Sequence, residues 1–143
     1  LFDLIEPDAS FFGEKDFQQL KIIKKLAIHI NKSIEIYSCP SIRLKNGISY
    51  SSRYSNFSLN QINIFNKVAK NIYIAINKLR KKINFKVIND LNNEMIKLGI
   101  TKIDYIEVRE EKNLSIIDNN HNARLFIAFY IEQIRIIDNF ALY

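Results

Sequence analysis

The sequence predicts two units of different fold class, an α/β segment over residues 1–41 and a small α+β domain over residues 42–143. In the first segment, hydrophobic residues at helical spacing lead into a short strand-like run, as in α/β units. In the second, two helix-like segments precede three strand-like segments, and such segregation is typical of α+β domains. We therefore expect the first segment to be the carboxyl-terminal end of a domain whose earlier strands lie outside the chain.

The composition is that of a soluble globular chain. Of 143 residues, 48% are hydrophobic and 25% are charged, which excludes disordered and collagen-like classes. No apolar run approaches the roughly 20 residues that cross a bilayer, and acids replace the basic start of an export signal, so we expect no membrane partner. Cys39 is the only cysteine, which excludes an internal disulfide and a multi-cysteine metal site and predicts a reducing, cytoplasmic location.

The first helix is predicted over residues 16–31. Its apolar positions recur every three or four residues, with lysines on the other side; they are Phe17, Leu20, Ile23, Leu26, Ala27 and Ile30. A strand-like run follows over residues 33–39, and Pro40 ends it because proline cannot donate to a strand ladder.

The second unit opens on a predicted hairpin-like turn, followed by two helices. Asn46-Gly47 separates two short β-prone runs and favours a tight turn. Ser58 and Gln61 have the spacing of a capping box, which predicts the start of a long helix that ends near Ile83. A shorter helix over residues 87–95 is predicted to end at Gly99, because glycine accommodates a left-handed backbone.

Alternation with a period of two predicts a short antiparallel sheet. Residues 103–108 alternate in this way, and the apolar runs 125–131 and 134–137 follow a polar loop at residues 118–122. We expect Arg124 and Arg135 to pair with Glu107 or Asp104 across the sheet.

Positive charge is concentrated in the middle of the chain. The formal net charge is +6, yet residues 42–89 contain ten basic residues and no acidic one. Such a segment either faces an anionic partner or forms a solvated surface. The second interpretation has weight because the chain is rich in Ile, Asn and Lys, a bias that an AT-rich genome imposes on any surface. A basic nucleic-acid-binding module is the alternative function, although stacking aromatics are sparse in this segment.

A glycine turn precedes the first helix in the run Phe12-Gly13-Glu14-Lys15-Asp16-Phe17-Gln18-Gln19-Leu20. Unpaired amides at a helix amino terminus, together with one lysine, form a favourable site for a phosphate group. The competing explanation is a capping box in which Asp16 caps the helix and Gln19 completes it. The spacing alone leaves both explanations open.

A second polar run, Ser51-Ser52-Arg53, follows the predicted turn. Two hydroxyl donors beside a planar guanidinium can bind phosphate oxygens. The competing explanation is a turn in which the serine side chains bond the local backbone.

Taken together and in this order, these runs resemble the pantoate–β-alanine ligase family, the pantothenate synthetases. The matching segments are Gly13-Glu14-Lys15-Asp16-Phe17-Gln18-Gln19-Leu20, Pro40-Ser41-Ile42-Arg43, Ser51-Ser52-Arg53, Asp104-Tyr105-Ile106-Glu107-Val108-Arg109, Ala123-Arg124-Leu125 and Arg135-Ile136-Ile137-Asp138-Asn139. The resemblance therefore covers almost the whole chain.

The resemblance implies a fold and a reaction. Residues 1–41 would be the end of a Rossmann-like nucleotide-binding domain, and residues 42–143 would be a small α+β lid domain that closes over ATP. The family uses ATP and Mg²⁺ to convert pantoate to pantoyl adenylate with release of pyrophosphate. The amine of β-alanine then displaces AMP and gives pantothenate.

The resemblance also implies roles for individual residues. Gly13 and Asp16 would lie against the ribose, Lys15 would reach the phosphates, the backbone of Ile42 would meet the adenine, Gln19 would hold pantoate, and Ser51, Ser52 and Arg53 would bind the β- and γ-phosphates. Lys15 and Arg53 would be the catalytic cations, and no side chain of the chain is assigned to a metal. Positioning and electrostatics would do most of the catalysis, because adenylation needs no protein nucleophile.

Some positions depart from the family pattern. Tyr50 replaces a common methionine, Tyr54 a usual asparagine and Asn46 a usual aspartate. The change at Tyr54 puts in question a polar anchor of the Ser-Ser-Arg run. The family's Met-Gly-x-Leu-His-x-Gly-His segment, whose histidines bind ATP phosphates, has no counterpart here.

We therefore expect the chain to be the carboxyl-terminal half of such an enzyme and to be inactive alone. The family's homodimer interface would lie largely in the missing half. His29 and His121 are expected at the surface, outside the site, and Cys39 is expected to be a small buried apolar residue.

Overall fold

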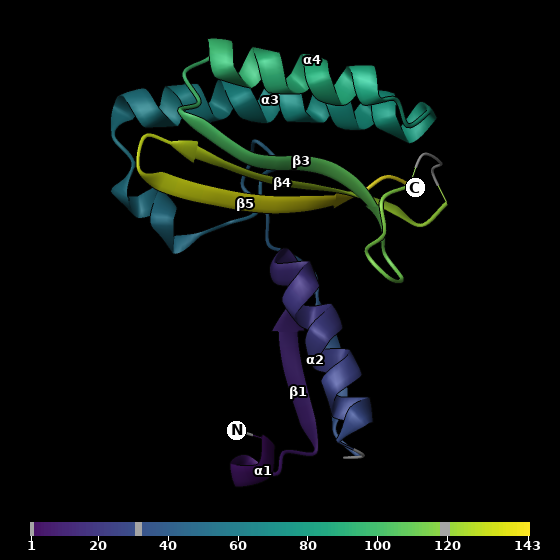
Figure 1. The fold of residues 1–143 in the computed structure, drawn as a ribbon. Helices are drawn as coiled ribbons and strands as arrows, with labels where there is room; N and C mark the ends of the chain where they lie inside the picture. The colour runs from purple at the N-terminus through teal and green to yellow at the C-terminus, as the bar shows by residue number, and fades with distance from the viewer. Residues whose placement is uncertain (1, 31–32, 118–120) are drawn as a thin grey trace. The chain divides into compact units, whose positions relative to one another are not determined.

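The computed structural model describes residues 2–30, 33–117 and 121–143. The chain divides into two compact units, unit 1 over Leu1–Ile42 and unit 2 over Arg43–Tyr143 (Figure 1). Among the described helices, none combines the length and the apolar character that crossing a bilayer requires.

Unit 1 contains a parallel strand–helix–strand crossover. Its elements are α1 (Phe2–Ile5), β1 (Ala9–Gly13), the 3-10 helix η1 (Glu14–Asp16), α2 (Phe17–His29) and β2 (Glu35–Cys39). β1 and β2 pair in parallel, with Gly13 opposite Cys39. The predicted helix and strand are confirmed as α2 and β2, whereas residues 31–32 lie outside the described residues. β1 was not predicted, because its adjacent Phe11 and Phe12 do not alternate with polar residues and Gly13 indicates a turn.

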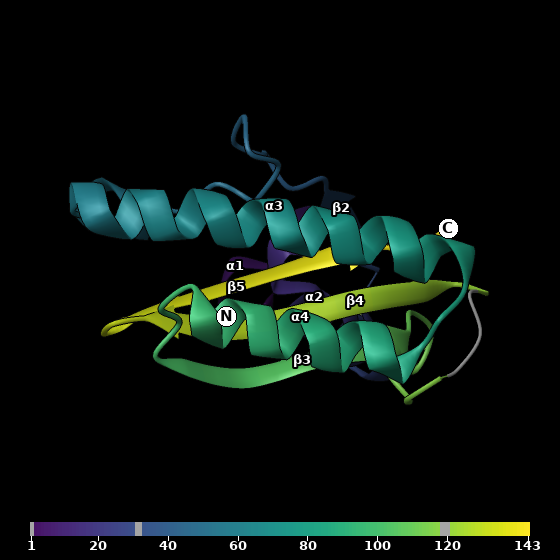
Figure 2. The ribbon, with the colours of Figure 1, turned by 90° about the horizontal axis from the view of Figure 1, so that it is seen from above.

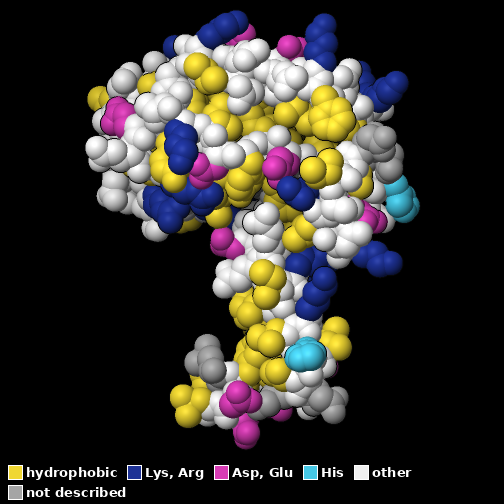
Figure 3. Space-filling model, in the orientation of Figure 1, with side chains coloured by type: hydrophobic (Ala, Val, Ile, Leu, Met, Phe, Trp, Pro, Cys, Tyr) yellow, Lys and Arg dark blue, Asp and Glu magenta, His cyan; other side chains and the backbone are white. Residues whose placement is uncertain are grey.

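Unit 1 carries apolar side chains on its surface (Figure 3). Phe11 is 69% exposed and stacks on the exposed Tyr37 of the neighbouring strand, with ring centroids 5.2 Å apart. Ile28 of α2 is 80% exposed and, with Ile34 and Ile36, lines an apolar hollow. Parallel sheets are normally covered on both faces, whereas this two-stranded sheet leaves apolar side chains exposed within the described residues.

Unit 2 is a three-stranded antiparallel sheet with two helices on one face (Figure 1). Its elements are the 3-10 helix η2 (Ser52–Asn56), α3 (Leu59–Lys81), α4 (Phe85–Lys97), β3 (Lys102–Glu110), β4 (Ala123–Ile131) and β5 (Ile134–Ala141), with the strands in the order β3-β4-β5. Figure 2 shows α3 and α4 side by side, with the strands behind them. The predicted helices and strands of this unit are confirmed.

The core of unit 2 lies between the helices and one face of the sheet. Alternate residues of β4 point into it, and they pack with buried side chains of both helices. The largest fully buried side chains include Ile72, Ile76, Leu79, Met95, Leu125, Ile127, Phe129 and Ile131. Each contributes about 1.5–3 kcal/mol through removal of apolar surface from water.

The predicted ends of the helices are confirmed. At the start of α3, the Ser58 Oγ accepts a hydrogen bond from the Gln61 N–H, and the Gln61 Oε1 accepts one from the Ser58 N–H. α4 ends at Lys97, Gly99 follows its C-cap residue with a φ of +100°, and the Ile100 N–H donates to the Met95 carbonyl. Both caps satisfy backbone groups that a helix end leaves without partners.

The ion pairs across the sheet differ in part from the expected ones. Arg135 pairs with Asp104 at 2.8 Å, as predicted. Arg124 pairs instead with Glu111 at 2.6 Å, so that prediction is wrong. The reason is register: Arg124 lies opposite Arg109, which takes Glu107 as its own partner.

A tight turn at Gly47 joins the two short runs that follow unit 1. Arg43 and Ser49 form an isolated antiparallel bridge, and the Gly47 N–H donates to the Leu44 carbonyl. Gly47 has a φ of +85°, and the ring of Tyr73 on α3 occupies the space that a Cβ would take. The Tyr73 hydroxyl donates to the Gly47 carbonyl at 3.0 Å. The predicted hairpin-like turn is therefore confirmed, and it is also held by α3.

Gly47→Ala is expected to lower the free energy of unfolding by about 2 kcal/mol, because the left-handed backbone disfavours a Cβ and the tyrosine ring must move. Urea unfolding of the two chains measures this difference. Gly47→Ala combined with Tyr73→Ala tests the steric part, since the double variant should lose less than the sum of the two single losses. Additive losses would contradict the proposed contact.

Candidate functional site

The predicted residues of unit 1 follow the carboxyl ends of its two strands. Gly13 ends β1 and Cys39 ends β2, and the two residues are register partners. Lys15 and Asp16 come directly after β1, and Ile42 comes shortly after β2. Ligands of open α/β sheets bind outside the carboxyl ends of the strands. The predicted residues of unit 1 follow these strand ends in the chain.

Asp16 and Gln19 do not form the capping box that was the alternative explanation. Asp16 is the N-cap residue of α2 by position, but its side chain makes no capping hydrogen bond. Both side chains are exposed. That alternative is therefore wrong, and the structure leaves both side chains on the surface of the helix start.

The backbone conformation at position 13 does not require a glycine. Its φ of −70° and ψ of 135° are ordinary for any residue. A Cβ built at this position meets no heavy atom within 4 Å. The space beside the end of β1 is therefore open, as close approach of a ligand to the backbone would need.

The Ser-Ser-Arg run of unit 2 forms the start of η2. The Ser51 Oγ accepts a hydrogen bond from the Arg53 N–H at 3.3 Å, and the Ser51 carbonyl accepts one from the Tyr54 N–H at 3.1 Å. The alternative explanation of a locally bonded serine thus holds for Ser51. Ser52 donates no side-chain hydrogen bond within the described residues, and its side chain is exposed.

Arg53 lies beside a hollow of about 370 Å³ that is lined by Arg53, Asn56, Gln133, Ile134 and Arg135. One of its N–H groups donates to the Arg135 carbonyl at 2.9 Å. No carboxylate among the described residues lies within ion-pair distance of Arg53, in contrast to Arg43, Arg109, Arg124 and Arg135. Four of its five N–H donors therefore stay available to an anion.

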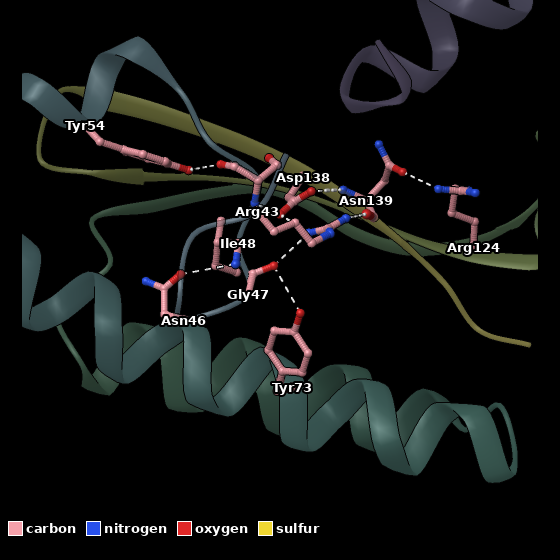
Figure 4. Close-up of polar contacts among 10 residues, drawn as sticks. Arg43, Asn46, Gly47, Ile48, Tyr54, Tyr73, Arg124, Asp138 and Asn139 are labelled. Atoms are coloured by element: carbon pink, nitrogen blue, oxygen red, sulfur yellow. Dashed lines mark hydrogen bonds and ion pairs between the residues drawn. The ribbon is translucent and has the colours of Figure 1, made fainter. Parts of the chain in front are cut away.

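A buried polar network holds the segment that leads into this run (Figure 4). The Asp138 Oδ2 accepts hydrogen bonds from the Ser49 N–H at 2.8 Å and from the Arg43 guanidinium at 3.1 Å. Arg43 also donates to the Gly47 and Asn139 carbonyls, both at 2.9 Å, and lies over the ring of Phe140. Burial raises the pKa of Asp138, while Arg43 and the two backbone donors oppose this shift.

Tyr54 anchors the far end of the run. Its hydroxyl donates to the Ser49 carbonyl at 2.9 Å, and its ring packs against Phe57 and Phe65. Burial raises the pKa of Tyr54, and the nearby Asp138 charge raises it further, so the phenol stays protonated. The tyrosine thus supplies a polar anchor of its own at the position where the family pattern has asparagine.

Other expectations for single residues are met only in part. His29 and His121 are exposed, as predicted, whereas Cys39 is half-buried and not fully buried as expected. Asn46, in place of an aspartate, donates to Asn66 on α3 and accepts from the Ile48 N–H.

Asp138 was not predicted as a functional residue. The period of β5 could have indicated it, because it places Asp138 on the same face as the apolar Ile136.

The described residues do not bring three His, Cys, Asp or Glu side chains together as a metal-binding group. Mg²⁺ is commonly bound through substrate phosphates with several waters retained.

Comparison with known proteins identifies relatives of the whole chain. A family model described as Pantoate-beta-alanine ligase matches residues 1–141. The curated pantothenate synthetase of Wigglesworthia glossinidia brevipalpis is 38% identical over 97% of this chain and 51% of its own length. That of Clostridium acetobutylicum is 36% identical over 98% of this chain and 51% of its own length. The chain thus spans about half the length of the curated relatives it matches.

Solved structures show the same fold. Pantothenate synthetase from Thermus thermophilus superposes with a TM-score of 0.81 at 23% identity, over 99% of this chain and 52% of that chain. The ligase from Francisella tularensis, described as complexed with beta-gamma ATP and beta-alanine, has a TM-score of 0.76 at 30% identity, over 99% of this chain and 46% of that chain. On the family match and these relatives, the chain belongs to the pantoate–β-alanine ligase family.

Proposed function

We propose that this chain supplies one half of the active site of an ATP-dependent ligase that condenses pantoate with β-alanine. The observation that carries the proposal is Arg53, a guanidinium without a carboxylate partner among the described residues, next to an open hollow and two serine residues. The family match and the ATP-complexed relative support the same assignment. The comparisons give no support to the alternative of a nucleic-acid-binding module.

The site residues are assigned to two groups, one on each unit. On unit 1, the end of a Rossmann-like domain, Gly13 and Asp16 lie against the ribose, Lys15 reaches the phosphates, the backbone of Ile42 meets the adenine and Gln19 holds pantoate. On unit 2, the lid domain, Ser51, Ser52 and Arg53 bind the β- and γ-phosphates. The open space at Gly13 and the exposed side chains of Asp16 and Gln19 support the first group.

The proposed chemistry depends on positioning and charge. The pantoate carboxylate must lie in line with the α-phosphorus, and an aligned two-substrate step recovers roughly 7–11 kcal/mol of its barrier. Negative charge passes to the leaving pyrophosphate, and in the proposal Lys15 and Arg53 stabilise it. Mg²⁺ would add positive charge at the phosphates. The attack of the β-alanine amine on the acyl carbon then releases AMP.

The chain is proposed to be inactive alone, because the histidine segment of the family is not among its residues. The exposed apolar surface of unit 1 supports the proposal that the other half of the enzyme packs there and completes the parallel sheet. A cytoplasmic homodimer through that other half is part of the same proposal.

A chimera tests the function directly. It joins the amino-terminal half of the Wigglesworthia pantothenate synthetase to this chain, and AMP release from ATP is measured. We expect AMP release only when pantoate and β-alanine are both present, and none from this chain by itself. AMP release that continues when pantoate or β-alanine is left out would count against the proposal. Tight, steeply salt-dependent binding of an oligonucleotide would favour the nucleic-acid alternative.

Gly13→Ala separates ligand contact from folding. The backbone at Gly13 accepts alanine without strain and the space is open, so the free energy of unfolding should stay unchanged or rise by up to about 1 kcal/mol. In the chimera, the KM for ATP should rise about tenfold, because the new methyl group takes the place of the ribose. An unchanged KM would remove Gly13 from the proposed site.

A further inference from the structure

Asp138 lies where an edge strand meets the segment that leads into the Ser-Ser-Arg run. β5 is an edge strand, and alternation places Asp138 on the core-facing side between Ile136 and Phe140. Its side chain is completely buried. A carboxylate in this position is costly unless hydrogen-bond donors surround it.

Three donors satisfy this carboxylate. The Oδ2 accepts from the Ser49 N–H at 2.8 Å and from Arg43 at 3.1 Å, and the Oδ1 accepts from the Asn139 N–H at 2.8 Å. Two of these donors, Arg43 and Ser49, belong to the hairpin-like turn before η2. Asp138 therefore fixes the backbone two residues before Ser51.

The carboxyl-terminal end of the run is also held at Ser49. The Tyr54 hydroxyl donates to the Ser49 carbonyl at 2.9 Å. The N–H and C=O of Ser49 are thus held by Asp138 and Tyr54, while the buried Ser49 Oγ has no hydrogen-bond partner within the described residues. Ser49 acts through its backbone, and the five residues after it form a loop closed at both ends.

β5 also holds the arginine of the loop. The Arg53 guanidinium donates to the carbonyl of Arg135, three residues before Asp138 on the same strand. A loop whose ends and cation are already in place loses less conformational freedom when an anion binds.

We propose that Asp138 is a positioning residue, which holds the Ser51–Arg53 run in the shape that binds phosphate groups. This inference rests on the proposed function, because it assigns the run its ligand class. Asp138 itself touches no substrate and acts through the backbone of Ser49 and through Arg43.

Asp138→Asn tests the inference in the full chain. An amide has one acceptor oxygen, so it cannot satisfy donors on both sides, and its NH₂ group would face an N–H donor. We expect hydrogen exchange at the amides of residues 49, 53 and 54 to accelerate at least tenfold, with the amides of α3 and β4 unchanged. Ser49→Ala is the matched control, because it keeps the backbone groups and should leave this exchange unchanged.

Equal acceleration throughout the chain, or no change at residues 49–54, would overturn the inference. Should Asp138→Asn fail to fold, Tyr54→Phe takes its place. It removes the hydroxyl bond to the Ser49 carbonyl, and we expect exchange at residue 53 to accelerate a few-fold.

Binding of inorganic tripolyphosphate, followed by NMR shifts of the residue 51–53 amides, connects the loop to its ligand. Asp138→Asn should weaken binding at least tenfold and Ser49→Ala should not, whereas Arg53→Ala should abolish it. Wild-type binding that depends on Arg53 but not on Asp138 overturns the inference and leaves the proposed function standing. An absence of wild-type binding counts against the phosphate assignment and against the inference that rests on it.

Discussion

Lys15→Ala is expected to slow AMP release by the chimeric ligase 10²- to 10³-fold, the loss typical for removal of one donor that stabilises transition-state charge. Lys15 lies in η1, directly after the end of β1, at the edge where parallel strands place their ligands. Its ammonium is assigned to the phosphates, where charge grows as pyrophosphate leaves. Because this interaction strengthens in the transition state, kcat should fall more than KM rises.

Rapid-quench measurement of the first turnover shows whether the adenylation step is the one affected. Lys25→Ala is the matched control, since Lys25 is an exposed lysine on α2, away from the strand ends. It should leave the rate within about twofold, as expected of a solvated charge. A first turnover that Lys15→Ala does not slow would remove Lys15 from the catalytic machinery.

Arg43→Ala is expected to lower the free energy of unfolding by about 3 kcal/mol at pH 7. It removes the charge partner of a carboxylate whose side chain is completely buried, and such a loss typically costs about 3–5 kcal/mol. Arg109→Ala, which breaks the half-exposed pair with Glu107, should cost at most about 1 kcal/mol. Urea unfolding of the three chains compares these losses.

The loss at Arg43 should depend on pH. Burial already raises the pKa of Asp138 above its ordinary value, and removal of Arg43 raises it further. At a pH below the ordinary aspartate value, Asp138 is protonated in the folded and unfolded chains, so only the bonds from Arg43 to carbonyls are lost. As the pH rises through the raised pKa, the unfolded chain ionises freely while the folded variant resists ionisation, and its stability falls relative to the wild type.

We therefore expect the difference between Arg43→Ala and wild type to be smallest near pH 3 and largest at neutral pH. Tyr54 also lies near Asp138, and it stays protonated throughout this range because its pKa is raised. Adding Asp138→Asn to both chains should abolish the pH dependence. A difference of equal size at every pH would show that the ion pair is not its cause.

Local patterns in the sequence predict most of unit 2. The capping box at Ser58, the glycine stop at Gly99 and the tight turn at Gly47 each depend on residues within a few positions of one another, and each is confirmed. The strands of unit 2 are long enough for the two-residue period to show. β1 was missed because its adjacent phenylalanines do not alternate with polar residues, although the parallel pairing of unit 1 depends on this strand.

The candidate site divides in the same way. The sequence predicts phosphate-binding residues at Gly13, Lys15 and the Ser-Ser-Arg run, because amides, hydroxyls and cations lie close together along the chain in each segment. The sequence could not decide between ligand binding and capping at Asp16, because both explanations use the same spacing. Its missing capping bond decided against the second.

The sequence by itself determined the two fold classes, the family and the residues proposed to meet ATP. Only the tertiary structure decided what holds the Ser51–Arg53 run. Asp138 is separated from Ser49 by 89 positions and from Arg43 by 95, so no local period or motif joins them. Their contact exists because packing of the sheet and helices brings an edge strand against the turn, and the low dielectric there makes each donor to the buried carboxylate matter.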